Sequence, residues 1–148
     1  MKILLAIDGS KFSNAAVEAV IAQSHPQHTD VHVLHVVEPP SLLVTREMSG
    51  IDRNLDAAWE IELKQAEDLV LSTANQLCAK GLNATGVVKQ GDAKSEILDA
   101  ARNWHADLIV LGSHGRKGME HFLMGSVCDA VARHAHCSVE IVRISPAK

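Results

Sequence analysis

Two short apolar runs limit what this chain can fold into. Residues 2–7 read KILLAI, and residues 108–111 read LIVL. A strand with one face in water alternates polar and apolar residues, whereas a strand covered on both faces does not. Residues 30–37, DVHVLHVV, are rich in β-branched side chains and predict a further strand. These runs favour a parallel sheet with helices packed on both faces.

Helical patterns separate the predicted strands. A helix should follow Ser10 or Ser13 as its cap and end before Pro26, while residues 55–80, 95–104 and 126–134 predict three more. The apolar stripe of the first helix would comprise Ala15, Ala16, Ala19, Val20 and Ala22, and that of the second would comprise Leu55, Ala58, Trp59, Leu63, Ala66, Leu69, Val70, Ala74 and Leu77. Residues 83–89 predict a weaker strand and residues 139–144 the last one. The alternation indicates one α/β domain over residues 1–148 with right-handed crossovers.

Two loops stand out because each follows the carboxyl end of a predicted strand. Asp8-Gly9-Ser10 follows the first, and a loop with Gly112, Gly115, Gly118 and Gly125 follows the strand at 108–111. Glycine lets the backbone approach an anion, and the start of the next helix offers free N–H groups. Ligands of open α/β sheets bind beyond the carboxyl ends of the strands. The two loops therefore predict one shared phosphate-binding site.

The glycine spacing distinguishes between phosphate motifs. Neither GxGxxG nor GxxxxGK[ST] is present, and the chain instead carries Gly112-x2-Gly115-x9-Gly125-Ser126. Together with the opening ILLAIDGS, this pattern closely resembles the ATP-binding branch of the universal stress protein family. The resemblance extends over nearly the whole chain, to VEIVRI near its end. The chain departs from the family at Cys137-Ser138, where Cys-Pro is frequent, and at Lys117, where a small residue is frequent.

The resemblance implies an open five-stranded parallel sheet in the order 3-2-1-4-5. It also implies a site for ATP, or for ADP or AMP, together with Mg²⁺. Asp8 would lie beside the ribose and phosphates, close to the Mg²⁺, and Ala6 and Val36 would line the adenine pocket. The other implied ligand-binding residues are Gly9, Ser10, Leu111, Gly112, His114, Gly115, Arg116, Gly125, Ser126 and Val127. The family commonly dimerises through the last strand, here residues 139–143.

The residues themselves agree with a bound anion, although simpler roles stay open. Residues 112–117 contain no carboxylate and offer Arg116 and Lys117. A carboxylate such as Asp8 suits a phosphate site mainly when a divalent cation lies between them. The alternatives are that Asp8 only caps a helix, that Ser126 is a plain N-cap, and that the glycines only form turns.

The composition of the chain argues against some classes of binding partner. The net charge is -4, aromatic residues make up 3%, and there is no Tyr, so neither nucleic acid nor an anionic membrane is an expected partner. No apolar run approaches the roughly 20 residues of a membrane span, and no signal peptide is evident, so we expect a cytoplasmic protein. Cys78, Cys128 and Cys137 lack CxxC spacing and are expected to be reduced thiols rather than a redox pair. The histidines lack the spacing of a zinc site.

The sequence favours a nucleotide-binding stress protein that acts as a sensor or switch. The glycine motif has no recognisable general base or second acidic ligand, so rapid turnover is not expected. One alternative is an interaction module in which residues 38–54 contact a protein partner and the nucleotide is a structural ligand. The other is a slow ATPase in which Asp8 holds the metal.

Overall fold

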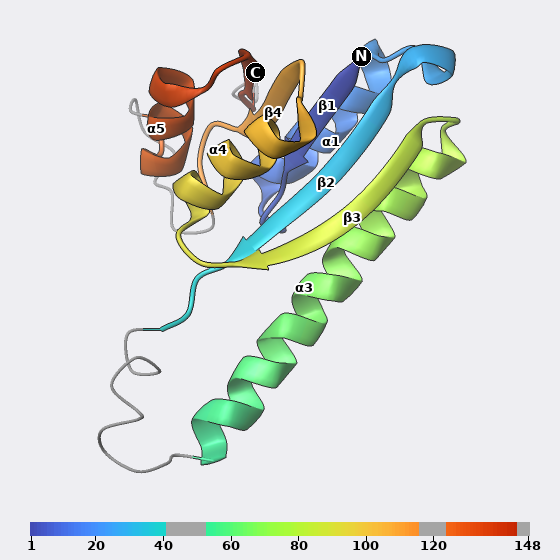
Figure 1. The fold of residues 1–148 in the computed structure, drawn as a ribbon. Helices are drawn as coiled ribbons and strands as arrows, with labels where there is room; N and C mark the ends of the chain where they lie inside the picture. The colour runs from blue at the N-terminus through green and yellow to red at the C-terminus, as the bar shows by residue number, and fades with distance from the viewer. Residues whose placement is uncertain (41–52, 116–123, 145–148) are drawn as a thin grey trace.

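The computed structural model describes residues 1–40, 53–115 and 124–144, which form an open sheet with helices on both faces (Figure 1). The strands are β1 (Lys2–Ala6), β2 (Asp30–Val37), β3 (Asn83–Gln90), β4 (Leu108–Gly112) and β5 (Ser138–Val142). The helices are α1 (Lys11–Gln23), the short 3-10 helix η1 (Pro26–His28), α3 (Arg53–Ala79), α4 (Ala93–Trp104) and α5 (Ser126–His134). The strands are parallel and lie in the order β3-β2-β1-β4-β5. The predicted fold class is confirmed.

The strands divide the core into two layers because successive side chains point to opposite faces. On one face, Ile3 and Leu5 of β1 pack with residues of α1 and α3, such as Val17 and Leu77. The core on the other face contains Leu4 and Ala6 of β1, Leu34 of β2, Ile109 and Leu111 of β4, Ile97 and Ala101 of α4, and Cys128 and Val131 of α5. Covering on both faces explains why the central strands lack polar alternation.

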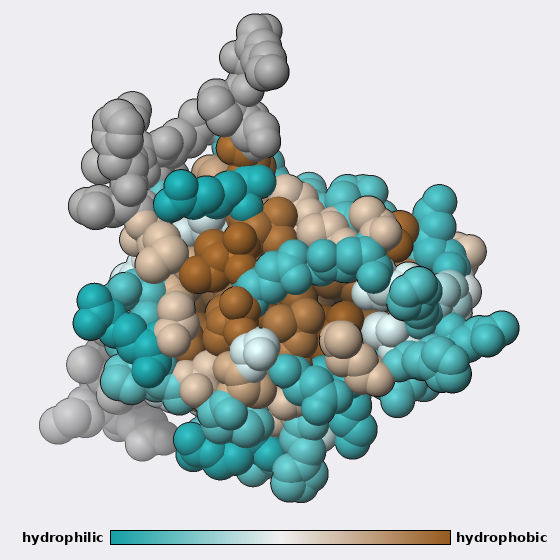
Figure 2. All heavy atoms as spheres, turned by 90° about the horizontal axis from the view of Figure 1, so that it is seen from above, coloured by the Kyte–Doolittle hydropathy of each residue, from teal (hydrophilic) through white to brown (hydrophobic). Residues whose placement is uncertain are grey.

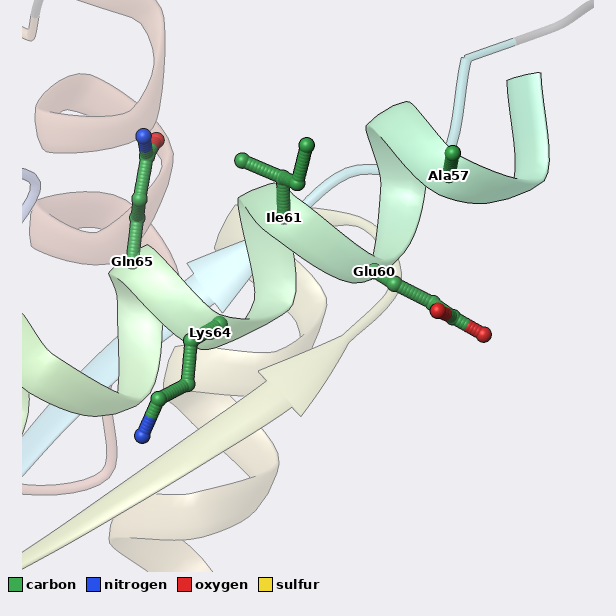
Figure 3. A pocket seen from close by; sticks show the side chains of 5 residues that line it. All are labelled: Ala57, Glu60, Ile61, Lys64 and Gln65. Carbon is green, nitrogen blue, oxygen red and sulfur yellow. The ribbon is translucent and has the colours of Figure 1, made fainter. Parts of the chain in front are cut away.

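Helix α3 is longer than the sheet that it covers, and its first half extends beyond β3 (Figure 1). Its buried residues are Ala66, Val70, Thr73, Ala74 and Leu77, all in the second half. Within the first half, Ala57, Glu60, Ile61, Lys64 and Gln65 line a shallow surface on this one helix (Figure 3). Among the stripe residues whose side chains are described, those that are buried therefore begin at Ala66, and the side chain of Leu55 lies outside the description. Ala58 is exposed, and Trp59 and Leu63 are only partly buried.

Several boundaries and stripe residues differ from the prediction. Helix α4 begins at Ala93 rather than at residue 95 because the Asp92 side chain caps it, accepting from the Ser95 N–H at 3.3 Å. The strand predicted from the weaker pattern at residues 83–89 is present and extends one residue further, to Gln90, with all eight of its residues paired with β2. Strand β5 ends at Val142, two residues early. On α1, Ala22 is exposed, whereas Phe12 and Val17 are buried.

Large apolar side chains reach the surface at several places among the described residues. Figure 2 shows hydrophobic residues in the middle of one face, surrounded by hydrophilic side chains. The large hydrophobic side chains that are exposed are Ile61 and Leu71 of α3 together with Met1, Met124 and Ile144, and scattered exposure of this kind is normal for a folded protein. Within these described parts, none of the helices combines the length and apolar character needed to cross a bilayer.

A histidine at the amino end of the sheet makes stability depend on pH. The His32 ring stacks on Trp104 at 5.2 Å between centroids, and its Nδ1 lies 3.0 Å from Thr85 Oγ1. Burial, with the positive charge of Lys89, lowers the pKa of His32 below its usual 6.5. Between the folded and unfolded pKa values, the unfolded chain binds more protons, so the free energy of unfolding falls as the pH drops below about 6.5.

We expect His32→Gln to weaken this pH dependence, because glutamine can hydrogen-bond but does not titrate. Urea unfolding of both proteins above and below the unfolded pKa measures it. The stability difference between them should favour the wild type more at the higher pH. A difference that does not change with pH would contradict the expectation.

Candidate functional site

The carboxyl end of β1 turns sharply at Asp8. Gly9 has a φ of 80°, a left-handed conformation that side chains rarely adopt, and the Ser10 N–H donates to Asp8 Oδ1 at 2.9 Å. Ser10 is the cap of α1, since its Oγ accepts from the Ser13 N–H at 3.2 Å. Asp8 is therefore not the cap of this helix, and its partly buried carboxylate is positioned by a turn of its own.

The loop after β4 brings Gly115 against this carboxylate. Ser113 is buried and its N–H donates to Val142 O at 3.0 Å, which continues the pairing of β4 with β5. Ser113 Oγ lies 2.9 Å from His114 Nδ1. A Cβ placed on Gly115 would lie 3.1 Å from Asp8 Oδ2. The structure thus brings together the two loops that the sequence predicted would share one site.

The start of α5 closes the same corner. The Gly125 N–H donates to Ser113 O at 2.9 Å, and a Cβ on Gly125 would lie 3.4 Å from the His114 Cα. Gly125 is the N-cap and has no side chain to bond the first turn, in which Ser126 is exposed. The interpretation of Ser126 as a plain N-cap is therefore wrong. A first turn without a side-chain cap leaves N–H groups and the positive helix end for an anion.

Gly112 has a packing role that its spacing did not reveal. A Cβ at this position would lie 2.6 Å from both the backbone carbon and the backbone oxygen of Phe12. Helix α1 therefore packs directly on the end of β4, and only glycine fits between them. The ring of Phe12 also lies 4.9 Å from that of His114, so α1 supports the glycine loop from behind.

The apolar residues implied for the adenine pocket lie at the carboxyl ends of adjacent strands. Ala6 pairs with Leu111 of β4 in the register of the sheet, and both are buried. Val36 and Val127 are partly buried and pack against the same core. Arg116 lies outside the described residues.

The chemistry of this corner fits one kind of cation site. Among the described residues, no group of three or more His, Cys, Asp and Glu side chains could hold a metal. Asp8 could instead supply the single protein carboxylate that Mg²⁺ commonly uses when nucleotide phosphates and water complete its shell.

Burial, with the nearby Asp129, raises the pKa of the Cys128 thiol in the first turn of α5. The thiol therefore stays protonated and adds no negative charge to the start of α5.

Two polar residues of β2 and its end, which were not predicted as site residues, connect elements at the carboxyl ends of the strands. Glu38 Oε1 accepts from the Ala93 N–H at 2.9 Å and so ties the end of β2 to the start of α4. His35 is buried, and its Nδ1 lies 2.6 Å from Ile7 O. A signal was present in the sequence, because His35 falls on the same strand face as Val31 and Val33 and so is a polar residue at a core position.

The fold and this corner define a class of α/β protein whose ligand-binding loops meet beyond β1 and β4. The sequence matches the model of the Universal stress protein family over residues 1–143. The chain belongs to that family. Universal stress protein YxiE from Bacillus subtilis is 30% identical over 146 residues, which cover 96% of this chain and 98% of the relative.

Solved structures share the fold. The structure of MJ0577, a universal stress protein of Methanocaldococcus jannaschii, superimposes with a TM-score of 0.86 at 23% identity, covering 99% of this chain and 97% of that one. A family protein from Arabidopsis thaliana, solved with AMP bound, has a TM-score of 0.68 at 19% identity, with 98% and 92% covered. A universal stress protein in complex with cAMP has a TM-score of 0.68 at 19% identity, with 98% of both chains covered.

Proposed function

We propose that this protein binds an adenine nucleotide, ATP with Mg²⁺ foremost, at the corner where the ends of β1 and β4 meet the start of α5. The observation that carries the proposal is the placement of Gly115 against Asp8, beside a helix start that no side chain caps. The two structures with AMP and cAMP bound support the choice of an adenine nucleotide, because they share the fold.

Each part of the corner has a task in the proposal. The backbone at Gly115 and the first turn of α5 would hold the phosphates, with Ser126 Oγ as an additional donor. Asp8 would orient the cation, which supplies positive charge to the phosphates when bound. Ala6 and Val36 would contact the base. We assign the protein a role in the stress response as a cytoplasmic nucleotide sensor or switch. Rapid turnover is not part of this role, because the glycine motif contains no recognisable general base, and slow hydrolysis is the alternative.

Isothermal titration with nucleotide, with and without Mg²⁺, tests the proposal. The variant Asp8→Asn tests whether the Asp8 carboxylate contributes the part of the affinity that depends on Mg²⁺. Asparagine keeps an oxygen for the Ser10 N–H and so should leave the turn intact. We expect the variant to lose the affinity that Mg²⁺ adds, about tenfold or 1.4 kcal/mol, and to bind metal-free nucleotide at least as well as the wild type. No binding by the wild type at millimolar nucleotide would remove the proposal.

Two further roles stay predictions. Strand β5 is an edge of the sheet and carries Val139 and Ile141, which are only partly buried. Pairing of residues 139–143 with a second copy would cover this edge and form a homodimer. The protein-interaction alternative rests on residues 38–54, of which 41–52 lie outside the described residues.

A further inference from the structure

A buried imidazole lies directly behind the Asp8 corner. His35 is 9% exposed and is, among the described residues, the one histidine that is buried. Its position in β2 places it on the sheet face of Val31 and Val33, which belong to a hydrophobic core cluster with residues of α1 and α3. Burying a polar side chain among apolar ones costs free energy unless the side chain is hydrogen-bonded, so the hydrogen-bond partner of His35 indicates its structural role.

The partner of His35 is the last peptide before Asp8. His35 Nδ1 lies 2.6 Å from Ile7 O. A carbonyl oxygen can only accept, so Nδ1 carries the proton and donates. The Ile7 N–H donates to Leu34 O at 2.9 Å. Strand β2 therefore holds both backbone polar groups of Ile7, one through its own backbone and one through the His35 ring.

This bond determines the direction of the peptide that joins Ile7 to Asp8, because the Ile7 carbonyl and the Asp8 nitrogen share one plane. The regular pairing of β1 with β2 ends at Ala6, so the side chain of His35 extends the constraint past the end of the strand. Asp8 then reaches Gly115 from a fixed starting point.

We propose that His35 is a positioning residue for the nucleotide site, which acts through Ile7 to fix where the Asp8 carboxylate meets the cation and phosphates. The inference rests on the proposed function. It assigns to His35 no contact with the nucleotide, so its effect should be limited to the part of the affinity that depends on Asp8.

The test compares His35→Leu, which fills the apolar layer without a donor, with His35→Asn, whose Nδ2–H₂ occupies the place of Nδ1 relative to Cβ. The measured quantity is the ratio of the nucleotide Kd without Mg²⁺ to the Kd with Mg²⁺. We expect His35→Leu to lower this ratio by about fivefold to tenfold with little change in the metal-free Kd, and His35→Asn to restore most of it. In the Asp8→Asn background, His35→Leu should have no further effect on the ratio.

A readout in the nucleotide-free protein keeps the test independent of loss of folding. The amide resonances of Asp8, Gly9 and Gly115 should shift in His35→Leu and return toward wild-type positions in His35→Asn, while thermal unfolding confirms that both variants are folded. Three results would overturn the inference without affecting nucleotide binding itself. They are amide resonances that do not shift in His35→Leu, a Kd ratio in His35→Leu equal to that of the wild type, and a further fall of the Kd ratio when His35→Leu is added to Asp8→Asn. A wild type that binds no nucleotide would overturn the proposed function first, and the role of His35 with it.

Discussion

Gly115→Val is expected to lower nucleotide affinity by at least about a hundredfold, or about 2.7 kcal/mol, while the protein stays folded. Gly115 is exposed and does not have a left-handed backbone, so valine strains neither the core nor the chain. Its Cβ would lie 3.1 Å from Asp8 Oδ2, and its methyl groups would extend further into the phosphate position. The side chain would thus displace the carboxylate and fill the cradle. Titration calorimetry measures the affinity, and thermal unfolding monitors the fold.

The control for this variant is a valine elsewhere on the exposed surface. Asn103→Val at the end of α4 replaces another exposed residue. This end of α4 contacts the amino end of β1, since Lys2 Nζ donates to Trp104 O at 3.3 Å, and so lies at the opposite end of the strand from Asp8. It should leave the nucleotide Kd within about twofold, since surface changes away from such features usually cost under 0.5 kcal/mol. Equal affinity of Gly115→Val and the wild type would show that the nucleotide does not use this loop.

Gly112→Ala is expected to have the opposite profile and to destabilise the fold by about 3 kcal/mol. The added methyl group would lie 2.6 Å from the backbone carbon and oxygen of Phe12, so helix α1 would have to move away from β4. A shift of α1 disturbs the core layer of Val17 and Val20, which are buried. For a chain of this size the melting temperature should fall by about 6–12 °C.

The matched control is Gly115→Ala, the same chemical change three residues later. Among the described residues, the new methyl group there would meet Asp8 Oδ2 at 3.1 Å, the tip of a side chain rather than backbone, so stability should change by no more than about 0.5 kcal/mol. Urea unfolding of both variants measures the difference. If the two alanines cost the same, the close approach of α1 to β4 does not limit stability.

The helices and strands were largely predictable because their signals are local. The apolar runs identified β1 and β4, and the helix predicted over residues 55–80 agrees with the end of α3 at Ala79, shortly before Gly81. The order of the strands came from the resemblance to a family, since periodicity does not say which strands are neighbours. The incomplete burial of Ala58, Trp59 and Leu63 in α3 was not predictable, because a stripe at helical spacing does not show whether a sheet lies beneath it.

The sequence predicted that two loops meet at the site, but it did not predict the separate role of each residue in them. The spacing of Gly112 and Gly115 suggested one shared role, whereas one glycine makes room for Phe12 and the other lies against Asp8. That distinction depends on which element packs behind each glycine, which is a tertiary property. His35 was missed for a related reason, because its partner lies 28 residues earlier in the chain.

The hydrogen bond from the Gly125 N–H to Ser113 O has an evolutionary consequence. It joins the point where the chain leaves β4 to the point where α5 begins, so both are fixed relative to each other by local contacts. Residues added or removed between these anchors need not displace either one, and each doubling of such a segment costs only about 0.6 kcal/mol. Relatives could therefore differ in the length and charge of the segment between Ser113 and Gly125, and so in ligand preference. The end of β4 and the start of α5, which lie beside Asp8, would keep their positions.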